Sequence, residues 1–465
     1  MTPITRDRAV VLGGSIAGLL AARVLAETHA EVVIVDRDHL GPEAGPRRGT
    51  PQARHLHGLL ARGQELLEEL FPGLTEELAA GGAPVGAMLG STRVCFGGHR
   101  FRQGPSGLTA LCVSRPTLEA VVRRRVLALP GVRVLGGRDV VGLTASRDRR
   151  RVVGARVIGR ADGSAEEQLP GDLVVNATGR GSRLPSWLEA LGCPPPQQER
   201  VDIGVGYASR RYRLPPGALG NDLVLLSAPT PGRPRGGGLS LIEGDQCLVT
   251  LMGVLGDHPP TDPDGFERFA ADLALPDVRE VLQHAEPLDE PVAFRYPSSI
   301  RRRYDRLTRF PDGLAVLGDA VCTLNPIYGQ GMTVAALEAA ALRRHLARGR
   351  SLRPRGYLRD IGRISGVAWA MALGADLSFP EVEGPRTPAT QMLGRYVGRL
   401  QAGAAHDPRL GRAFLRVTSL VDPPPMLLRP SVLVRAITAR TTRHRRQLLA
   451  GGGTRRCEIR TPGDT

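Results

Sequence analysis

The residues with the clearest chemistry lie in a glycine-rich turn near the N-terminus, which reads GGSIAG over residues 13–18. A short apolar run precedes the turn, a helical pattern follows it, and a second apolar run ends on Asp36. In this order Gly13 permits a tight turn, Gly18 lets the helix pack closely on the strand, and the first helical N–H groups can bind a pyrophosphate. Asp36 is placed to accept hydrogen bonds from an adenosine ribose. We therefore predict a dinucleotide site formed by Gly13, Gly14, Ser15, Ile16, Ala17, Gly18, Asp36 and Arg37.

Ser15 departs from the usual fingerprint, because it stands where the middle glycine of G-x-G-x-x-G is expected. Its Cβ narrows the approach of a ligand to the backbone, whereas its hydroxyl could donate to a phosphate. The alternative is an α/β unit that binds nothing at this turn, and the strand–helix context with Asp36 disfavours it. The turn alone does not separate NAD from FAD.

A second glycine-rich stretch, GDAVCTLNPIYGQGM at residues 318–332, distinguishes these two cofactors. It follows the apolar run 313–317, so Asp319 lies at the carboxyl end of a strand, where open α/β sheets bind ligands. Gly329 and Gly331 directly precede a helix, whose N–H groups and dipole favour a flat or anionic ligand. An isoalloxazine ring needs such a site and a nicotinamide domain lacks one, so we predict FAD.

The hydrophobic pattern indicates the elements that would position these turns. With 465 residues, 42% of them apolar and 23% charged, the chain is long enough for an elaborated globular fold. We predict an α/β fold: a Rossmann-like FAD-binding domain with an inserted β-sheet substrate domain and a helical C-terminal region. The expected bounds are 1–199 for the first part of the FAD-binding domain, with a small antiparallel meander at 131–160; 200–305 for the substrate domain; 306–350 for the return of the FAD-binding domain; 351–450 for the helical region; and 451–465 for a disordered tail.

Composition excludes several classes of partner. The net charge of +16 comes from arginine alone, since the chain has no lysine, and only 4% of residues are aromatic. Scattered arginines without base-stacking platforms predict no nucleic-acid partner. Six cysteines without a C-x-x-C pair indicate a reducing compartment and no metal site. No apolar run approaches the ~20 residues of a membrane span and no signal peptide is evident, so we expect a cytoplasmic monomer or homodimer.

Four motifs, taken together, resemble the FAD-dependent monooxygenases of the p-hydroxybenzoate hydroxylase fold: GGSIAG with its aspartate, SRPTLE at 114–119, NATGRGSR at 176–183 and GDAVCTLNPIYGQGM. More narrowly, RRGTPQARHLH at 47–57, DLVVNATGRGSR and NPIYGQGM are similar to the actinobacterial flavin epoxidases of polyether biosynthesis and, more distantly, to squalene epoxidase. The resemblance covers most of the chain. Its cofactor motifs are specific, whereas its substrate region is not.

The resemblance implies a role for each matching residue outside the first turn. Arg47 and Gln52 would lie near the ribityl chain or the flavin, and Arg115 would contact the pyrophosphate or the ribityl region. Asp319 would bind ribityl or phosphate-linked hydroxyls, and Pro326 would line the isoalloxazine. The N–H groups facing the anionic N1/C2=O edge of the reduced flavin would come from Gly329, Gly331 and Met332.

The resemblance also implies the reaction. Reduced flavin would react with O2 to give a C4a-hydroperoxide, whose distal oxygen passes to the substrate. This transfer needs an apolar, water-poor pocket more than a general base. His55 and His57 could polarise the peroxide or contact the flavin, or they could be histidines with only local hydrogen bonds. Tyr296 and Tyr328 are candidates for the substrate pocket, although packing is the commoner role of a tyrosine.

One departure bears on the electron donor: Thr178 replaces the aspartate of the Asp-Gly motif that self-sufficient hydroxylases of this fold carry. Electrons could therefore come from NAD(P)H directly or through a separate flavin reductase. We expect epoxidation of an alkene in a largely apolar secondary metabolite. Aromatic hydroxylation is the alternative, and flavin-dependent reduction of a prenyl chain is less favoured. Halogenation is disfavoured, since family halogenases use a lysine and a W-x-W-x-I-P motif, whereas Trp187 and Trp369 stand far apart.

Overall fold

The computed structural model describes residues 8–347 and 351–439. In these ranges the first glycine turn belongs to a five-stranded parallel sheet with the order β18-β11-β1-β2-β7. Its strands are short apolar runs, mostly buried, as is usual for a parallel sheet whose two faces are both covered. Their bounds are β1 (Arg8–Leu12), β2 (Glu31–Val35), β7 (Val132–Leu135), β11 (Leu173–Asn176) and β18 (Leu314–Val316).

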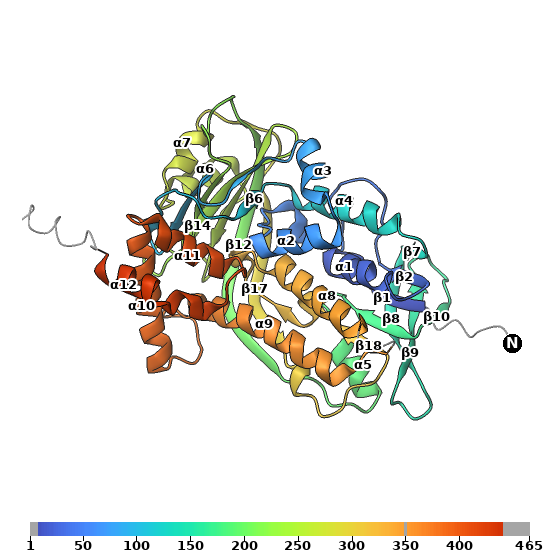
Figure 1. The fold of residues 1–465 in the computed structure, drawn as a ribbon. Coiled ribbons are helices and arrows are strands. Elements are labelled where there is room, and N and C mark those ends of the chain that lie inside the picture. Colours follow the sequence, from blue (N-terminus) through green and yellow to red (C-terminus); the bar gives the residue numbers. More distant parts are fainter. Residues whose placement is uncertain (1–7, 348–350, 440–465) are drawn as a thin grey trace, which may run out of the picture.

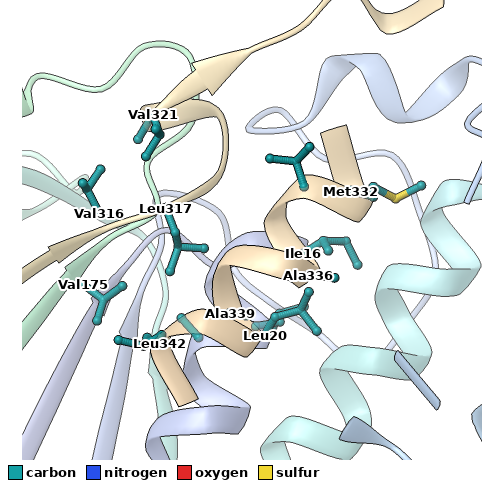
Figure 2. Packing of buried hydrophobic residues seen from close by; sticks show 14 of the residues in the cluster. Ile16, Leu20, Val175, Val316, Leu317, Val321, Met332, Ala336, Ala339 and Leu342 are labelled. Carbon is teal, nitrogen blue, oxygen red and sulfur yellow. The ribbon is translucent and has the colours of Figure 1, made fainter. Parts of the chain in front are cut away.

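The two helices that begin at the glycine turns pack side by side on this sheet (Figure 1). They are α1 (Ile16–Leu25) and α8 (Gly331–Ala347). Figure 2 shows Leu20 of α1 beside Ala339 of α8, and Ala336 and Ala339 are both fully buried. Because alanine side chains are small, the two helices approach closely. The N-termini of both helices therefore lie at the carboxyl ends of the strands of the parallel sheet.

The antiparallel meander starts later than the predicted range 131–160. It consists of β8 (Arg138–Ala145), β9 (Val152–Gly159) and β10 (Glu166–Pro170), whereas Val132–Leu135 pairs in parallel with β2. The prediction was wrong at this strand because a short apolar run does not reveal its pairing partner.

A second, largely antiparallel sheet has the order β19-β17-β12-β15-β14-β13-β4-β5 over the described residues, with β16 beside β12. Two of its strands, β4 and β5, come from the range predicted for the FAD-binding domain, and β19 comes from the predicted return. The sheet is therefore not confined to 200–305. Its bounds are β4 (Thr92–Phe96), β5 (His99–Arg100), β12 (Gln198–Arg213), β13 (Val224–Ser227), β14 (Arg235–Ile242), β15 (Gln246–Gly253), β16 (Glu286–Pro287), β17 (Val292–Arg302) and β19 (Cys322–Thr323).

The helical C-terminal region is present, as predicted. Its last three helices pack with Leu89, Val94 and Phe101 in a core of their own, and Figure 1 shows them grouped at one end of the molecule. The prediction of a disordered tail at 451–465 lies outside the described residues. The remaining elements are β3 (Val85–Ala87), β6 (Thr109–Leu111), α2 (Ala61–Leu70), α3 (Leu74–Ala80), α4 (Arg115–Leu127), α5 (Leu184–Ala190), α6 (Pro263–Ala271), α7 (Asp277–Leu282), α9 (Pro354–Asp376), α10 (Pro388–Ala404), α11 (Pro408–Thr418) and α12 (Pro430–Thr438).

Two features of the described residues bear on partners. No helix in 8–347 or 351–439 is both long and apolar enough to cross a membrane. Within the same ranges, no group of three or more histidine, cysteine or acidic side chains could hold a metal ion.

Candidate active site

The GGSIAG turn has the backbone shape that its glycines suggest. Gly13 has a φ of +103°, and a Cβ there would lie 2.5 Å from the carbonyl oxygen of Ala177. A Cβ on Gly18 would overlap the carbonyl oxygen of Gly13. Ser15 precedes α1, but its side chain does not cap the helix. The first N–H groups of α1 therefore remain available to an anionic ligand.

A buried network of charges lies beside this turn. Ser15 Oγ donates to Glu119 Oε2 at 2.8 Å, and Arg115 Nη2 donates to Ser15 Oγ at 3.1 Å. Arg47 pairs with the other oxygen of Glu119 and lies 3.5 Å from Asp36. Burial acts to raise the pKa of Glu119, but Arg115, Arg47 and Ser15 outweigh it and lower the pKa. An ionised glutamate thus holds two arginines next to the turn, where a pyrophosphate would need positive charge.

Asp36 lies directly after β2, as predicted, and its carboxylate orders the turn itself. Oδ2 accepts from the Gly14 N–H at 2.6 Å, and Oδ1 accepts from the Asp38 N–H at 2.8 Å. Burial raises the pKa of Asp36. Its contact with a ribose stays a prediction. Arg37 is exposed and lies 3.4 Å from Asp139 of β8, so its side chain does not join the charges at the turn.

The second glycine stretch meets the first at the carboxyl ends of the strands of the parallel sheet. Gly318 has a φ of +70°, and a Cβ there would lie 2.8 Å from the Cβ of Ala17. Asp319 follows in the 3-10 turn η3 (Gly318–Ala320), and a Cβ on Gly331 would lie 3.9 Å from its Oδ1. The N-terminal ends of α1 and α8 and the Asp319 carboxyl therefore lie close to one another.

The surroundings of Asp319 fit a polar ligand. Burial raises the pKa of its carboxyl, and Arg115, Arg180 and Arg302 oppose that rise. Among the described residues, the Nε–H groups of Arg115 and Arg302 are buried and have no hydrogen-bond partner. Unpaired buried donors cost free energy, and ribityl or phosphate oxygens could satisfy them. The donor set therefore fits FAD, and the roles of Arg115 and Asp319 in holding it stay predictions.

The loop before α8 has the shape expected of a flavin edge. Pro326–Tyr328 form the 3-10 turn η4, and Gly329 follows with a φ of +65°. A Cβ on Gly329 would lie 3.5 Å from the carbonyl oxygen of Gly58, so the loop lies against the segment that carries the two histidines. The Met332 side chain packs in the core (Figure 2). Only its backbone N–H could therefore face a flavin.

His55 is held by a chain of hydroxyl groups from the second sheet. Its Nδ1 lies 2.7 Å from Ser209 Oγ, and Ser209 Oγ lies 2.6 Å from Thr250 Oγ1. The imidazole lies against the rings of Tyr207 and Phe294, at centroid distances of 5.9 and 5.4 Å. Burial lowers the pKa of His55 to about 4, so it is neutral at physiological pH. Its contact with a flavin or a peroxide stays a prediction.

His57 and Gln52 belong to the same segment. The Nδ1–H of His57 donates to the carbonyl oxygen of His55 at 2.9 Å. Burial, with Arg115 as the next cause, lowers the pKa of His57 to about 3. Gln52 is half-buried in the 3-10 turn η1 (Pro51–Arg54). Of the two imidazoles, only that of His57 thus has a local hydrogen bond, since that of His55 bonds to Ser209 of the second sheet. The contact of either histidine with a flavin stays a prediction.

The two tyrosines named as pocket candidates have different surroundings. Tyr296 of β17 is buried, and the Arg180 guanidinium lies over its ring at 4.7 Å. The Tyr328 hydroxyl donates to Asp376 at 2.7 Å. Sequence reasoning assigned no role to Arg180, although it lies in NATGRGSR, or to Asp376, which no motif marks. For Tyr296 and Tyr328, membership of the substrate pocket stays a prediction.

The fold has counterparts among solved structures. The flavin-dependent brominase Bmp2 matches with a TM-score of 0.63 and 17% identity, over 92% of this chain and 97% of that one. PqsL, a probable FAD-dependent monooxygenase from Pseudomonas aeruginosa, matches with a TM-score of 0.56 and 19% identity, over 88% and 99%. These likenesses confirm the predicted fold, which is that of the FAD-dependent monooxygenases.

Relatives identified by sequence show the family to which the chain belongs. Protein Rv3254 of Mycobacterium tuberculosis is 37% identical over 452 residues, 93% of each chain, and the present chain belongs to its family. A kynurenine 3-monooxygenase from Salinispora tropica is 28% identical over 374 residues, 72% of each chain. No protein-family profile matches the sequence. The relationships confirm an FAD-dependent enzyme of the monooxygenase class, whereas closeness to the polyether epoxidases stays a prediction.

Proposed function

We propose that the chain inserts one oxygen atom of O2 into a carbon–carbon double bond of a largely apolar small molecule, giving an epoxide. The observation that carries the proposal is the meeting of the two glycine turns at Gly318 and Ala17, beside Arg115 and Asp319. FAD bound there would supply the activated oxygen.

The residues of the site divide the work of holding the cofactor. Arg115 would neutralise its pyrophosphate at the N-terminus of α1, Arg47 would lie near its ribityl chain, and Asp319 would accept hydrogen bonds from its ribityl hydroxyls. The N-terminus of α8 would stabilise negative charge at the isoalloxazine edge. Each group is already in place through contacts within the chain, so binding would need little reorganisation.

The side facing the second sheet supports an apolar substrate. The rings of His55, Tyr207, Phe294 and Tyr296 gather there, and His55 is neutral because burial lowers its pKa to about 4. Such surfaces exclude water, which protects a reactive oxygen species from wasteful hydrolysis. In this setting His55 could orient a substrate without carrying a charge into the pocket.

Aromatic hydroxylation is the second candidate, and the 28% identical kynurenine 3-monooxygenase favours it. An electron-rich aromatic ring also offers π electrons to an electrophilic oxygen, so one site could serve either reaction. Halogenases share the fold, as Bmp2 shows. The chain has no lysine to serve as the halogenase lysine, so we do not propose halogenation.

Oxygen consumption with isotopically labelled O2 tests the proposal. The protein, FAD and a panel of polyenes and aromatics would be supplied with NADPH, or with NADH and a separate flavin reductase. We expect substrate-stimulated O2 uptake and a product that carries one labelled oxygen atom, as an epoxide from an alkene. A phenol from an aromatic compound would favour the second candidate instead. Reduction of a double bond without O2 uptake would refute both and indicate a prenyl-chain reductase.

A further inference from the structure

A buried carboxylate from the C-terminal region reaches the loop at the predicted flavin edge. Asp376 is the last residue of α9 and is 1% exposed. Its Oδ1 accepts from Asn325 Nδ2 at 2.8 Å and from Tyr328 Oη at 2.7 Å. Asp376 therefore contacts side chains on both sides of Pro326.

The position is an unfavourable one for a carboxylate. The C-terminal end of a helix carries partial negative charge, which repels an anion. Within residues 8–347 and 351–439, no arginine or histidine forms an ion pair with Asp376, and burial raises its pKa to about 6. An apolar side chain would avoid the cost of burying this charge. Stability alone does not explain an aspartate here.

The two hydrogen bonds determine the shape of the loop. Asn325 Oδ1 accepts from the Ile327 N–H at 3.1 Å, so Asn325 links Asp376 to the backbone of the turn Pro326–Tyr328. Tyr328 directly precedes Gly329, whose φ is +65°. Anchoring Asn325 and Tyr328 therefore places both Pro326 and the N–H groups that lead into α8.

We propose that Asp376 is a positioning residue for the flavin, because it holds the loop Asn325–Tyr328 that faces the isoalloxazine. The inference rests on the proposed FAD site, and it assigns α9 a part in that site. A competing role is direct binding of a substrate, since the nearby Tyr207 hydroxyl is buried and has no partner among the described residues. The experiment must separate these two roles.

Two substitutions of Asp376 separate its hydrogen bonds from its charge. Asp376→Asn keeps an oxygen that can accept from both Asn325 and Tyr328, whereas Asp376→Leu removes both bonds and keeps the branched shape of the side chain, with larger methyl groups in place of the oxygens. We expect Asp376→Leu to weaken FAD binding about tenfold or more in a fluorescence titration and to change the visible circular dichroism of the bound flavin. Asp376→Asn should keep the FAD affinity and the flavin dichroism of the wild type. Ser365→Ala, at a buried site of α9 remote from the loop, is the control and should change neither.

The outcomes distinguish the possibilities. Unchanged FAD affinity and flavin dichroism in Asp376→Leu would overturn the inference, and a rise in KM alone would also overturn it by assigning Asp376 to the substrate. If Asp376→Leu does not fold, Tyr328→Phe decides the matter: a several-fold loss of FAD affinity supports the inference, and wild-type affinity with wild-type dichroism overturns it. If the wild-type protein binds no FAD, the proposed function fails together with this inference.

Discussion

Asp319 and Asp376 both carry carboxylates near the predicted flavin, but Asp319 is half-buried whereas Asp376 is buried, and their neighbours differ. Asp319 faces the field of Arg115, Arg180 and Arg302, whereas Asp376 accepts hydrogen bonds from two neutral side chains. Burial raises the pKa of both, and only Asp319 has cations to oppose that rise. At the scale of single residues, the first carboxylate suits ligand binding and the second suits the holding of a loop.

Replacing Asp319 should therefore affect the cofactor directly. We expect Asp319→Ala to weaken FAD binding about tenfold or more, because a hydrogen-bond acceptor for the ribityl chain is lost. Equilibrium titration with FAD measures the effect. The control is Asp148→Ala, which removes an exposed carboxylate. Equal FAD affinity of the two variants would refute the site assignment.

The buried charge of Asp376 should make stability depend on pH. Its pKa is about 6 in the folded protein against the ordinary 3.8, so the folded state binds the proton more tightly than the unfolded state. The free energy of unfolding should then fall as pH rises from about 4 through 6, by about 2 to 3 kcal/mol from this group.

Urea denaturation of the wild type and of Asp376→Asn at pH 4.5 and at pH 7 measures this dependence. The asparagine has no proton to lose, so this part of the slope should vanish in the variant. Parallel pH dependence of the two proteins would show that Asp376 does not titrate in this range.

At the scale of elements, the site depends on two helices that begin at glycine turns. Small side chains at Ala336 and Ala339 let α8 approach α1, and Gly18 lets α1 approach its own strand. Because both helices start at the carboxyl ends of the strands, their N–H groups and dipoles act on one region. The arrangement leaves little space for additional atoms at the crossing points.

Gly18→Ala should destabilise the protein, since the added Cβ would overlap the carbonyl oxygen of Gly13. We expect a loss of about 1 to 3 kcal/mol in the free energy of unfolding and weaker FAD binding. Gly394 is a matched control, because it is also a helical glycine but has no atom within 4 Å of the position that an added Cβ would take. Gly394→Ala should stabilise α10 by about 0.5 to 1 kcal/mol. Similar denaturation curves for both variants would contradict the tight packing of α1.

At the scale of the whole molecule, the parallel sheet carries the predicted cofactor site and the second sheet lies on the predicted substrate side. The second sheet includes β4, β5 and β19, which come from ranges predicted for the FAD-binding domain. The last helices pack beside β4 and β5. The segment with His55 and His57 touches the second sheet and the loop at Gly329. The predicted site therefore draws residues from both parts.

The assembled protein should carry its cofactor through purification. We expect a yellow protein whose visible spectrum is that of oxidised flavin, and FAD should appear in the supernatant after denaturation. Chromatography of the released flavin would identify it as FAD. A colourless protein that does not take up added FAD would refute the cofactor assignment.

The sequence by itself determined the fold class and both glycine turns. A tight turn at Gly13 or a helix start at Gly331 depends on local backbone conformation, which neighbouring residues specify. The motifs also marked Arg47, Arg115 and Asp319, which the structure places at one site. The motif did not show that the Arg37 side chain lies toward Asp139, because side-chain direction depends on packing, and its contact with the cofactor stays a prediction.

Only the tertiary structure decided which distant segments meet. Val132–Leu135 joins the parallel sheet, and β4 joins the second sheet beside β13, because strand pairing depends on partners that lie far away in sequence. Asp376 is 51 residues from Asn325, and no local pattern distinguishes it from other helix-terminal aspartates. Its importance follows from burial and two hydrogen bonds, which exist only after α9 has packed against the loop.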